Sequence, residues 1–406
     1  MHKVMSVTIC LFSLLALVVS ACAASQVATQ PPTQAPTQAP TAPPAKATPA
    51  PTTPPAKATP APSAKPAWQD DWDKTLAEAK KEGTVVVYTQ YGAQWRAAMN
   101  EAMTRKYGIT VDVLTATSGE ISQRVMKEQN SKTYQADAVI IGASEFQVTF
   151  QPAGVLQSFE KDIIQPEVVD TKAWWTGGLH WVDPDTKSYL QFYDYVTPTL
   201  VINSDLVKPG EIKSWKDLLS PRWKGAMVSN DPTVSGNGIT LMTMFAFGLM
   251  DWNYVTDLSK QELMFSRDNR LMTEWVARGK YPIVLAPHTE TTADFIKSGA
   301  PLVYITAVEG TYSTPGSGNL SRPKGSPHPN AAKIFANFLL TKEGQTLSSK
   351  ATGHQSARVD VPTDGLNPAI IRQPGAKYFS NTDPEFMKKS IELKNKVTDL
   401  FKPLLK

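Results

Sequence analysis

Short apolar runs alternate with segments of helical periodicity after residue 84, and this alternation constrains the fold more than any other feature of the sequence. The strands predicted in the first half are residues 85–89, 110–114 and 136–141. Between them, Trp95, Met99 and Met103 lie four residues apart, and a second helix opens at Ser118-Gly119. Nearly continuous apolar strands that are joined by helices are typical of an α/β unit with a mainly parallel sheet.

The same alternation returns in the second half of the chain. The strands predicted there are residues 199–202, 226–229, 283–286 and 302–305. An apolar helix over 239–249 follows the second of these strands, and an amphipathic helix begins near Asn330. The sequence therefore predicts a second α/β unit.

Charge and cysteine are unevenly distributed. The chain has 41 lysines and arginines, 37 acidic residues and a formal net charge of +4. Residues 1–67 contain four lysines and no arginine or acidic residue, so the remainder of the chain is neutral overall. A neutral folded part argues against nucleic acid as a partner. Both cysteines, Cys10 and Cys22, also lie in this segment. This excludes a disulfide framework, a thiolate metal site and a cysteine nucleophile from the rest of the chain.

The N-terminus has the pattern of an export signal, because an apolar run from Val4 to Val19 follows Lys3. An uncleaved membrane anchor is the alternative, since about 18 apolar residues nearly span a bilayer. The sequence Val19-Ser20-Ala21-Cys22 resembles the lipobox of bacterial lipoproteins. The resemblance implies that residues 1–21 are a signal peptide and that Cys22 is lipidated. It also implies anchoring on the extracytoplasmic face of the bacterial cell membrane.

Residues 22–67 are predicted to be a linker that follows the lipidated cysteine. Gln26–Ala67 contains 13 prolines in 42 residues, and the sequence of Pro43–Pro51 recurs at Pro54–Pro62. This composition cannot bury a core, so we expect a disordered spacer with a reach on the order of 100 Å. A docking ligand for proline-binding modules is the alternative.

Seven short motifs occur in the order in which one known family has them. They are Ala79–Gly83, Tyr107–Val111, Ser118–Glu120 with Arg124 and Glu128, Ala136–Val139, Trp215–Leu218 with Trp223–Gly225, Pro327–Lys333 and Glu343–Gln345. Through these motifs the chain resembles, over nearly all of Trp68–Asp360, the extracellular solute-binding proteins of ABC importers. The relevant group includes the ferric-iron-binding periplasmic proteins.

The resemblance implies the type II periplasmic-binding-protein fold, in which two α/β lobes are joined by two hinge crossings. The expected domains are 68–197 for the first part of lobe 1, 198–304 for lobe 2, 305–351 for the return into lobe 1, and 352–406 for a C-terminal tail packed mostly on lobe 2. In this family a ligand closes the lobes, and an ABC permease recognises the closed form. We expect the protein to be a monomer.

Loops that follow strands carry candidate ligand-binding residues, because ligands on parallel sheets lie at the carboxyl ends of the strands. These candidates are Gln90, Tyr91, Thr117, Ser118 and Ser144. In the loop 231–238, Ser235, Gly236 and Asn237 precede a helix and would offer N–H groups and a hydroxyl to an anion. An ordinary capped turn is the alternative for this loop.

Arg124 is a further candidate, since a guanidinium can clamp a carboxylate or a phosphate with two hydrogen bonds. It could equally pair with Glu128 one helical turn on. His288 and Thr289 are candidates because of a difference from the ferric-binding branch. That branch has an adjacent tyrosine pair after the strand that corresponds to residues 283–286, and this chain has none there. Ferric iron favours phenolate and carboxylate oxygens, so the difference disfavours iron.

The sequence therefore predicts a membrane-anchored protein that captures a small organic or oxyanion ligand and delivers it to an ABC importer. Two alternatives stay open, a metal-binding member of the same family and a ligand-sensing lipoprotein that feeds a receptor. The chain has no HExxH, GxSxG or Walker motif, and no GxGxxG after a strand. We therefore expect neither enzymatic activity nor a cofactor, with a hydrolase on this fold as the alternative.

Overall fold

Two β-sheets organise the residues that the structure, a computed structural model, describes, namely 65–208 and 210–405. The predicted signal peptide, Cys22 and all but the last three residues of the linker lie outside the described residues. The contacts group residues 64–406 into a single unit. Within the described residues, no helix is long and apolar enough to cross a membrane.

The first sheet has the strand order β2-β1-β3-β13-β5-β4. Its strands are β1 (Thr84–Thr89), β2 (Thr110–Thr115), β3 (Ala138–Ile141), β4 (His180–Trp181), β5 (Tyr189–Gln191) and β13 (Asn319–Ser321). β1 pairs in parallel with β2 and β3, as the alternation predicts. Val85 and Val87 enter the core on one face of this sheet, and Tyr88 enters the core on the other face. β1 and β3 are nearly all apolar because cores lie on both faces of this part of the sheet.

Helices from both ends of the described residues cover the first sheet. They are α1 (Ala67–Glu82), α2 (Ala93–Tyr107), α3 (Ser118–Ser131), α4 (Ala143–Glu145), α5 (Gln151–Ala153), α6 (Pro166–Val169), α11 (Pro329–Leu340) and α12 (Lys342–Thr352). Trp72 of α1, Trp95 of α2 and Phe335 of α11 share one core, whereas Ile121 of α3 lies in the core on the opposite face. α1 begins at Ala67, the last residue assigned to the linker.

The second sheet has the strand order β11-β7-β10-β8-β9. Its strands are β7 (Leu200–Asn203), β8 (Met227–Asn230), β9 (Met264–Ser266), β10 (Ile283–Leu285) and β11 (Leu302–Tyr304), and its helices are α7 (Asn237–Met244), α8 (Trp252–Ser259), α9 (Asn269–Ala277) and α10 (Thr289–Lys297). The four strands predicted for this part are confirmed within one residue at each end. The fifth strand, β9, was not predicted, because it is a half-buried edge strand of three residues.

The two sheets share one connectivity. Each sheet contains three parallel strands that are consecutive in the chain, and the first of the three lies between the other two: β1 between β2 and β3, and β8 between β9 and β10. In each sheet the next position is taken by an antiparallel strand that arrives from the other sheet, β13 in the first and β7 in the second. We call the first sheet with its helices the first lobe and the second sheet with its helices the second lobe. Each lobe therefore contains one strand that the chain forms after it has crossed over from the other lobe.

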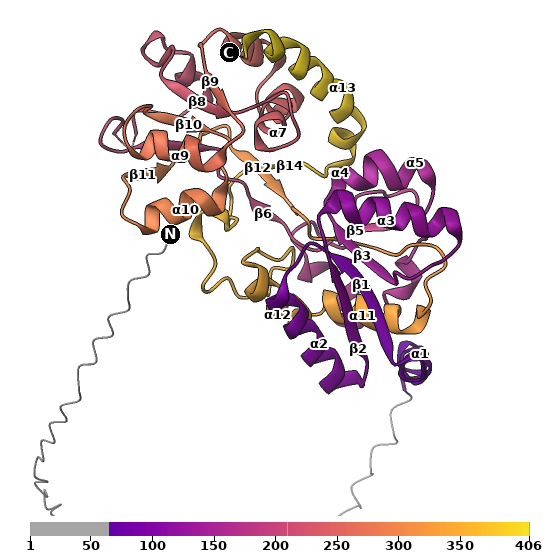
Figure 1. The fold of residues 1–406 in the computed structure, drawn as a ribbon. Helices are drawn as coiled ribbons and strands as arrows, with labels where there is room; N and C mark the ends of the chain where they lie inside the picture. The colour runs from indigo at the N-terminus through magenta and orange to yellow at the C-terminus, as the bar shows by residue number, and fades with distance from the viewer. Residues whose placement is uncertain (1–64, 209, 406) are drawn as a thin grey trace, which may run out of the picture. The chain divides into compact units, whose positions relative to one another are not determined.

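A small third sheet of three strands, β14-β12-β6, connects the lobes. β6 (Tyr195–Val196) leads from the first lobe toward β7, and β12 (Thr311–Thr314) leads back toward β13. β12 pairs with β6 in antiparallel orientation and with β14 (Tyr378–Ser380) in parallel orientation. Figure 1 shows these strands between the two larger sheets. The chain therefore passes between the lobes a third time through β14, which the sequence analysis did not foresee.

The C-terminal tail contacts both lobes in turn. Ala357 lies in the core of the first lobe, and its N–H donates to the carbonyl of Phe192. After β14 the tail enters the core of the second lobe with Phe386 and Phe401 of α13 (Pro384–Phe401). We expect from the sequence that the tail packs mostly on the second lobe. In the structure its first part lies on the first lobe.

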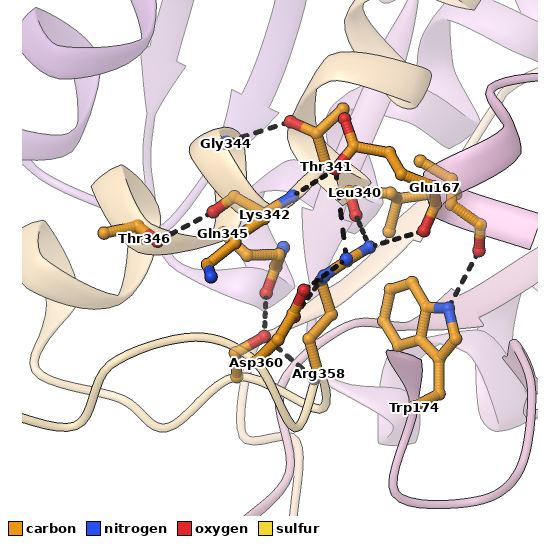
Figure 2. A network of polar contacts seen from close by, with 12 residues as sticks. Glu167, Trp174, Leu340, Thr341, Lys342, Gly344, Gln345, Thr346, Arg358 and Asp360 are labelled. Atoms are coloured by element: carbon orange, nitrogen blue, oxygen red, sulfur yellow. Dashed lines mark hydrogen bonds and ion pairs between the residues drawn. The ribbon is translucent and has the colours of Figure 1, made fainter. Parts of the chain in front are cut away.

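Arg358 holds this first part of the tail in place (Figure 2). Its side chain is 2% exposed, and its Nη1 donates to the carbonyls of Glu167 at 2.9 Å and Leu340 at 3.1 Å. Its Nε and Nη2 bind both carboxylate oxygens of Asp360, each at 2.9 Å. The guanidinium also lies 5.4 Å from the ring centre of Trp174. One side chain thus joins the tail to two separate segments of the first lobe.

Buried carboxylates explain two of the motifs that the resemblance uses. Asp137, which is fully buried, accepts from the N–H of Val86, the hydroxyl of Ser326 and both the N–H and Nδ1 of His328. Glu82 accepts from the backbone N–H of Asn330 and Ala331, so a carboxylate of α1 caps the N-terminus of α11. In this chain both motifs therefore hold the first lobe together.

Candidate functional site

A cavity of about 610 Å³ is lined by residues of both lobes and of the strands between them. This volume is within the range of small-molecule sites. The residues that line the cavity are Gln90, Tyr195, Thr197, Ser235, Gly236, Asn237, Thr240, His288, Thr289, Glu290, Tyr312, Thr314, Gly316, Ser317, His354 and Asn381. We call it the interlobe cavity. Its wall consists mainly of hydroxyl, amide and aromatic groups.

Six of the residues that the sequence predicted lie in the interlobe cavity. They are Gln90, Ser235, Gly236, Asn237, His288 and Thr289. Those of the second lobe come from the N-terminal ends of two helices, since α7 begins at Asn237 and α10 at Thr289. Each strand of the pair β8 and β10 therefore leads into a helix whose start faces the cavity, as expected for parallel strands.

The backbone at the start of α7 is held tightly. The side chain of Asn230 accepts from the N–H of Gly238 at 3.0 Å. A Cβ added at Gly238 would lie 2.2 Å from the carbonyl oxygen of Asn230, so only glycine fits there. Asn237 donates from Nδ2 to the carbonyl of Pro287 at 2.9 Å, which joins the starts of α7 and α10. Among the described residues we find no acceptor for the backbone N–H of Asn237.

Neither Ser118 nor Thr117 lines the cavity. The hydroxyl of Ser118 donates to Oε1 of Gln90 at 2.8 Å, and the hydroxyl of Ser317 donates to the same atom. Gln90 is thereby oriented by one residue of the first lobe and one from the loop after β12. Thr117 is the N-cap of α3, and its N–H and hydroxyl both donate to Glu120 in a capping box.

Three other candidates are placed elsewhere. Tyr91 is buried, with its ring 5.5 Å from that of Trp95, and Ser144 is exposed on α4. The Nε of Arg124 donates to Glu128 and to the hydroxyl of Tyr88, each at 3.0 Å. The structure therefore shows the pairing that the sequence left open as the alternative to a ligand contact. None of the three lines the interlobe cavity.

Of the lining residues that the sequence did not single out, four lie on or next to the strands between the lobes. Tyr195 belongs to β6, Thr197 directly follows it, and Tyr312 and Thr314 belong to β12. A signal existed for Tyr195 and Thr197, because the boundary between the lobes was expected at residues 197–198 and side chains near it had to meet the space between the lobes. His354 and Asn381 had no such signal, since the tail brings them to the cavity.

His354 stacks on Tyr195, with the ring centres 4.5 Å apart and an angle of 7° between the planes. The rings of Tyr91 and Tyr193 surround it at 6.4 and 5.6 Å. Burial holds the pKa of the His354 imidazole below its usual value, and burial raises the pKa of the Tyr195 phenol. Both groups are therefore neutral near pH 7, and the stack forms an uncharged wall.

The chemistry of the cavity does not resemble that of a metal site. Within the described residues, no three His, Cys, Asp or Glu side chains converge closely enough to hold a metal ion. The phenol of Tyr195 would have to ionise to serve as a ferric ligand, and burial opposes that ionisation.

The comparison with protein families now decides the class of protein. The family model of the bacterial extracellular solute-binding proteins matches residues 86–346. The chain belongs to this family. Its members bind small ligands, deliver them to the permease complexes of ABC importers and are not enzymes.

Individual relatives agree with this assignment. The solute-binding protein is 25% identical over 300 residues to a putative 2-aminoethylphosphonate-binding periplasmic protein of Salmonella typhimurium, covering 70% of this chain and 82% of the relative. Among solved structures it resembles the periplasmic binding protein AfuA of Actinobacillus pleuropneumoniae with bound fructose-6-phosphate (TM-score 0.54, 19% identity, 80% of this chain and 99% of that one). It also resembles a Trichodesmium protein, IdiA or FutA, in complex with iron and citrate (TM-score 0.60, 16% identity, 79% and 99%). The predicted type II periplasmic-binding-protein fold is confirmed.

Proposed function

We propose that this solute-binding protein captures a small organic oxyanion in the interlobe cavity and passes it to an ABC importer, acting without catalysis. The observation that carries the proposal is the composition of the cavity wall. Hydroxyl and amide donors from both lobes and two helix N-termini meet there, and this arrangement suits an anion that is bound by hydrogen bonds.

Two features support an oxyanion at the start of α7. The N–H of Asn237 belongs to the first turn of α7, where N–H groups carry partial positive charge. Ser235 and Thr240 place hydroxyl groups on the same part of the wall. Because these groups come from one lobe and Gln90 and Ser317 belong to the other side, an oxyanion between them would favour lobe closure.

A ligand panel tests this function. We expect one organic oxyanion to raise the thermal midpoint of the purified full-length protein in a concentration-dependent way. The panel contains 2-aminoethylphosphonate, ethylphosphonate, fructose-6-phosphate, citrate, inorganic phosphate and ferric citrate. At 100 times its Kd a ligand stabilises the native state by about 2.7 kcal/mol, which gives a clear shift of the midpoint. A shift with ferric citrate but not with citrate would support the metal-binding alternative, and no shift with any oxyanion would contradict the proposal.

We also propose that the protein is held on the extracytoplasmic face of the membrane by lipid on Cys22. The lipobox-like sequence before this cysteine supports the anchor. Replacing Cys22 with alanine is expected to move the protein from the membrane fraction to the soluble fraction, or to leave the signal uncut. The measurement is fractionation with immunodetection, and Cys10→Ala is the matched control, which should stay anchored. Normal anchoring of Cys22→Ala would contradict the assignment.

A further inference from the structure

The interlobe cavity has an unusual balance of charged side chains for an anion site. Among the described residues that line it there is neither a lysine nor an arginine, and the only acidic side chain is Glu290. The two histidines of the wall are His288 and His354, of which His354 is buried against Tyr195. An oxyanion in this cavity would therefore meet neutral donors and a single carboxylate.

Glu290 lies in the first turn of α10, and its side chain is 64% exposed. Its one close charged or titratable partner among the described residues is Nε2 of His288, at 3.3 Å. The carboxylate also affects two other residues that line the cavity. Burial has the largest effect on the pKa of His354 and of Tyr195, and the negative charge of Glu290 has the second largest and raises both pKa values. Glu290 lines the same cavity as Tyr195 and His354.

This placement creates a conflict for a ligand that carries negative charge only. Such a ligand would gain hydrogen bonds from the neutral donors but would be repelled by the Glu290 carboxylate. A cationic group at the other end of the same ligand turns the repulsion into an attraction. The conflict disappears for a ligand that carries both charges.

We propose that the cavity selects an oxyanion that also carries an amino group, and that Glu290 determines this preference by accepting the ammonium. The oxyanion end would face the start of α7 at Ser235 and Asn237, and the ammonium end would lie at the start of α10. This inference rests on the proposed function, because it assigns the second charge of the ligand that the proposed function places in the cavity.

A pair of probes that differ only in the amino group tests the inference. We expect the full-length protein to bind 2-aminoethylphosphonate at least ~10-fold more tightly than ethylphosphonate in titration calorimetry. The variant Glu290→Gln keeps the shape of the side chain and removes its charge. It should weaken binding of the aminated probe ~10-fold or more and leave binding of ethylphosphonate unchanged or tighter. Glu392→Gln removes one charge from an exposed position on α13 and is the control, expected to bind both probes as the parent protein does.

Each other outcome overturns the inference in a recognisable way. If the protein binds the two probes equally, or if Glu290→Gln still prefers the aminated probe as strongly as the parent protein does, Glu290 does not recognise the amino group. The inference would then be wrong, while the proposed function would stand. Binding of an amine-free panel member such as fructose-6-phosphate, with neither probe bound, would also leave the function intact and the inference wrong. If no oxyanion of the panel binds, the proposed function and the inference fail together.

Discussion

Replacing Arg358 with methionine is expected to lower the free energy of unfolding by about 3 kcal/mol. The guanidinium is almost completely buried and is the donor to the carbonyls of Glu167 and Leu340. Methionine fills a similar volume but donates nothing, so both carbonyls lose a charged hydrogen-bond partner in a place that water does not reach. Contact with the ring of Trp174 is reduced as well.

Urea-induced unfolding followed by tryptophan fluorescence measures this effect. The matched control is Arg278→Met, because Arg278 also pairs with a carboxylate, Glu274 at 2.7 Å, but its side chain is 77% exposed. We expect the control to cost no more than about 0.5 kcal/mol. If the two variants unfold at the same urea concentration, Arg358 does not join the tail to the first lobe with the strength that its contacts indicate.

Replacing Ser235 with tryptophan is expected to weaken ligand binding at least ~100-fold, which corresponds to about 2.8 kcal/mol. Ser235 lies on the wall of the interlobe cavity at the start of α7, and its side chain is exposed. An indole at this position occupies the space that a ligand needs and opposes lobe closure. Because the side chain is exposed in the absence of ligand, the substitution should leave the thermal midpoint of the unliganded protein unchanged.

Calorimetric titration with the oxyanion that the panel identifies measures the loss of affinity. Ser158→Trp places the same large side chain at an exposed serine that does not line the cavity, and it should bind the ligand normally. Unchanged affinity in Ser235→Trp would remove the start of α7 from the ligand site. A lowered thermal midpoint in both variants would instead indicate that exposed tryptophan itself disturbs the fold.

The candidate site was predictable where its residues follow strands in the sequence. Ser235 to Asn237 and His288 to Thr289 lie between β8 or β10 and the first turn of the helix that follows, and the rule for parallel strands was enough to find them. The same rule selected Ser144 and Tyr91, which the structure places on a surface helix and in a core. Sequence position locates the loop, but the direction of each side chain depends on packing that the sequence pattern does not contain.

The residues of the site that could not be predicted reach it through contacts between segments that are far apart in the sequence. His354 and Asn381 reach the cavity because the tail follows the first lobe and then returns through β14, a path held by contacts such as those of Arg358. Three strands of the first sheet, β1 to β3, and four of the second could be predicted because they read as short apolar runs, whereas β4, β5, β9 and β13 have only two or three residues and could not. The tail has no such run between residues 353 and 377, so its path had no signal in the sequence.

β13 sets the order in which the chain can fold. Its residues Asn319–Ser321 are buried in the interior of the first sheet, between β3 and β5, and pair with both. During synthesis β1, β2 and β3 are made early. The sheet cannot join β3 to β5 through β13 until residue 321 has been made. By then the strands of the second sheet have all been made. The first sheet is therefore completed only by pairing between strands that are far apart in the sequence, and such pairing is slow. We therefore expect the first lobe to complete its sheet late, after the strands of the second lobe have been made.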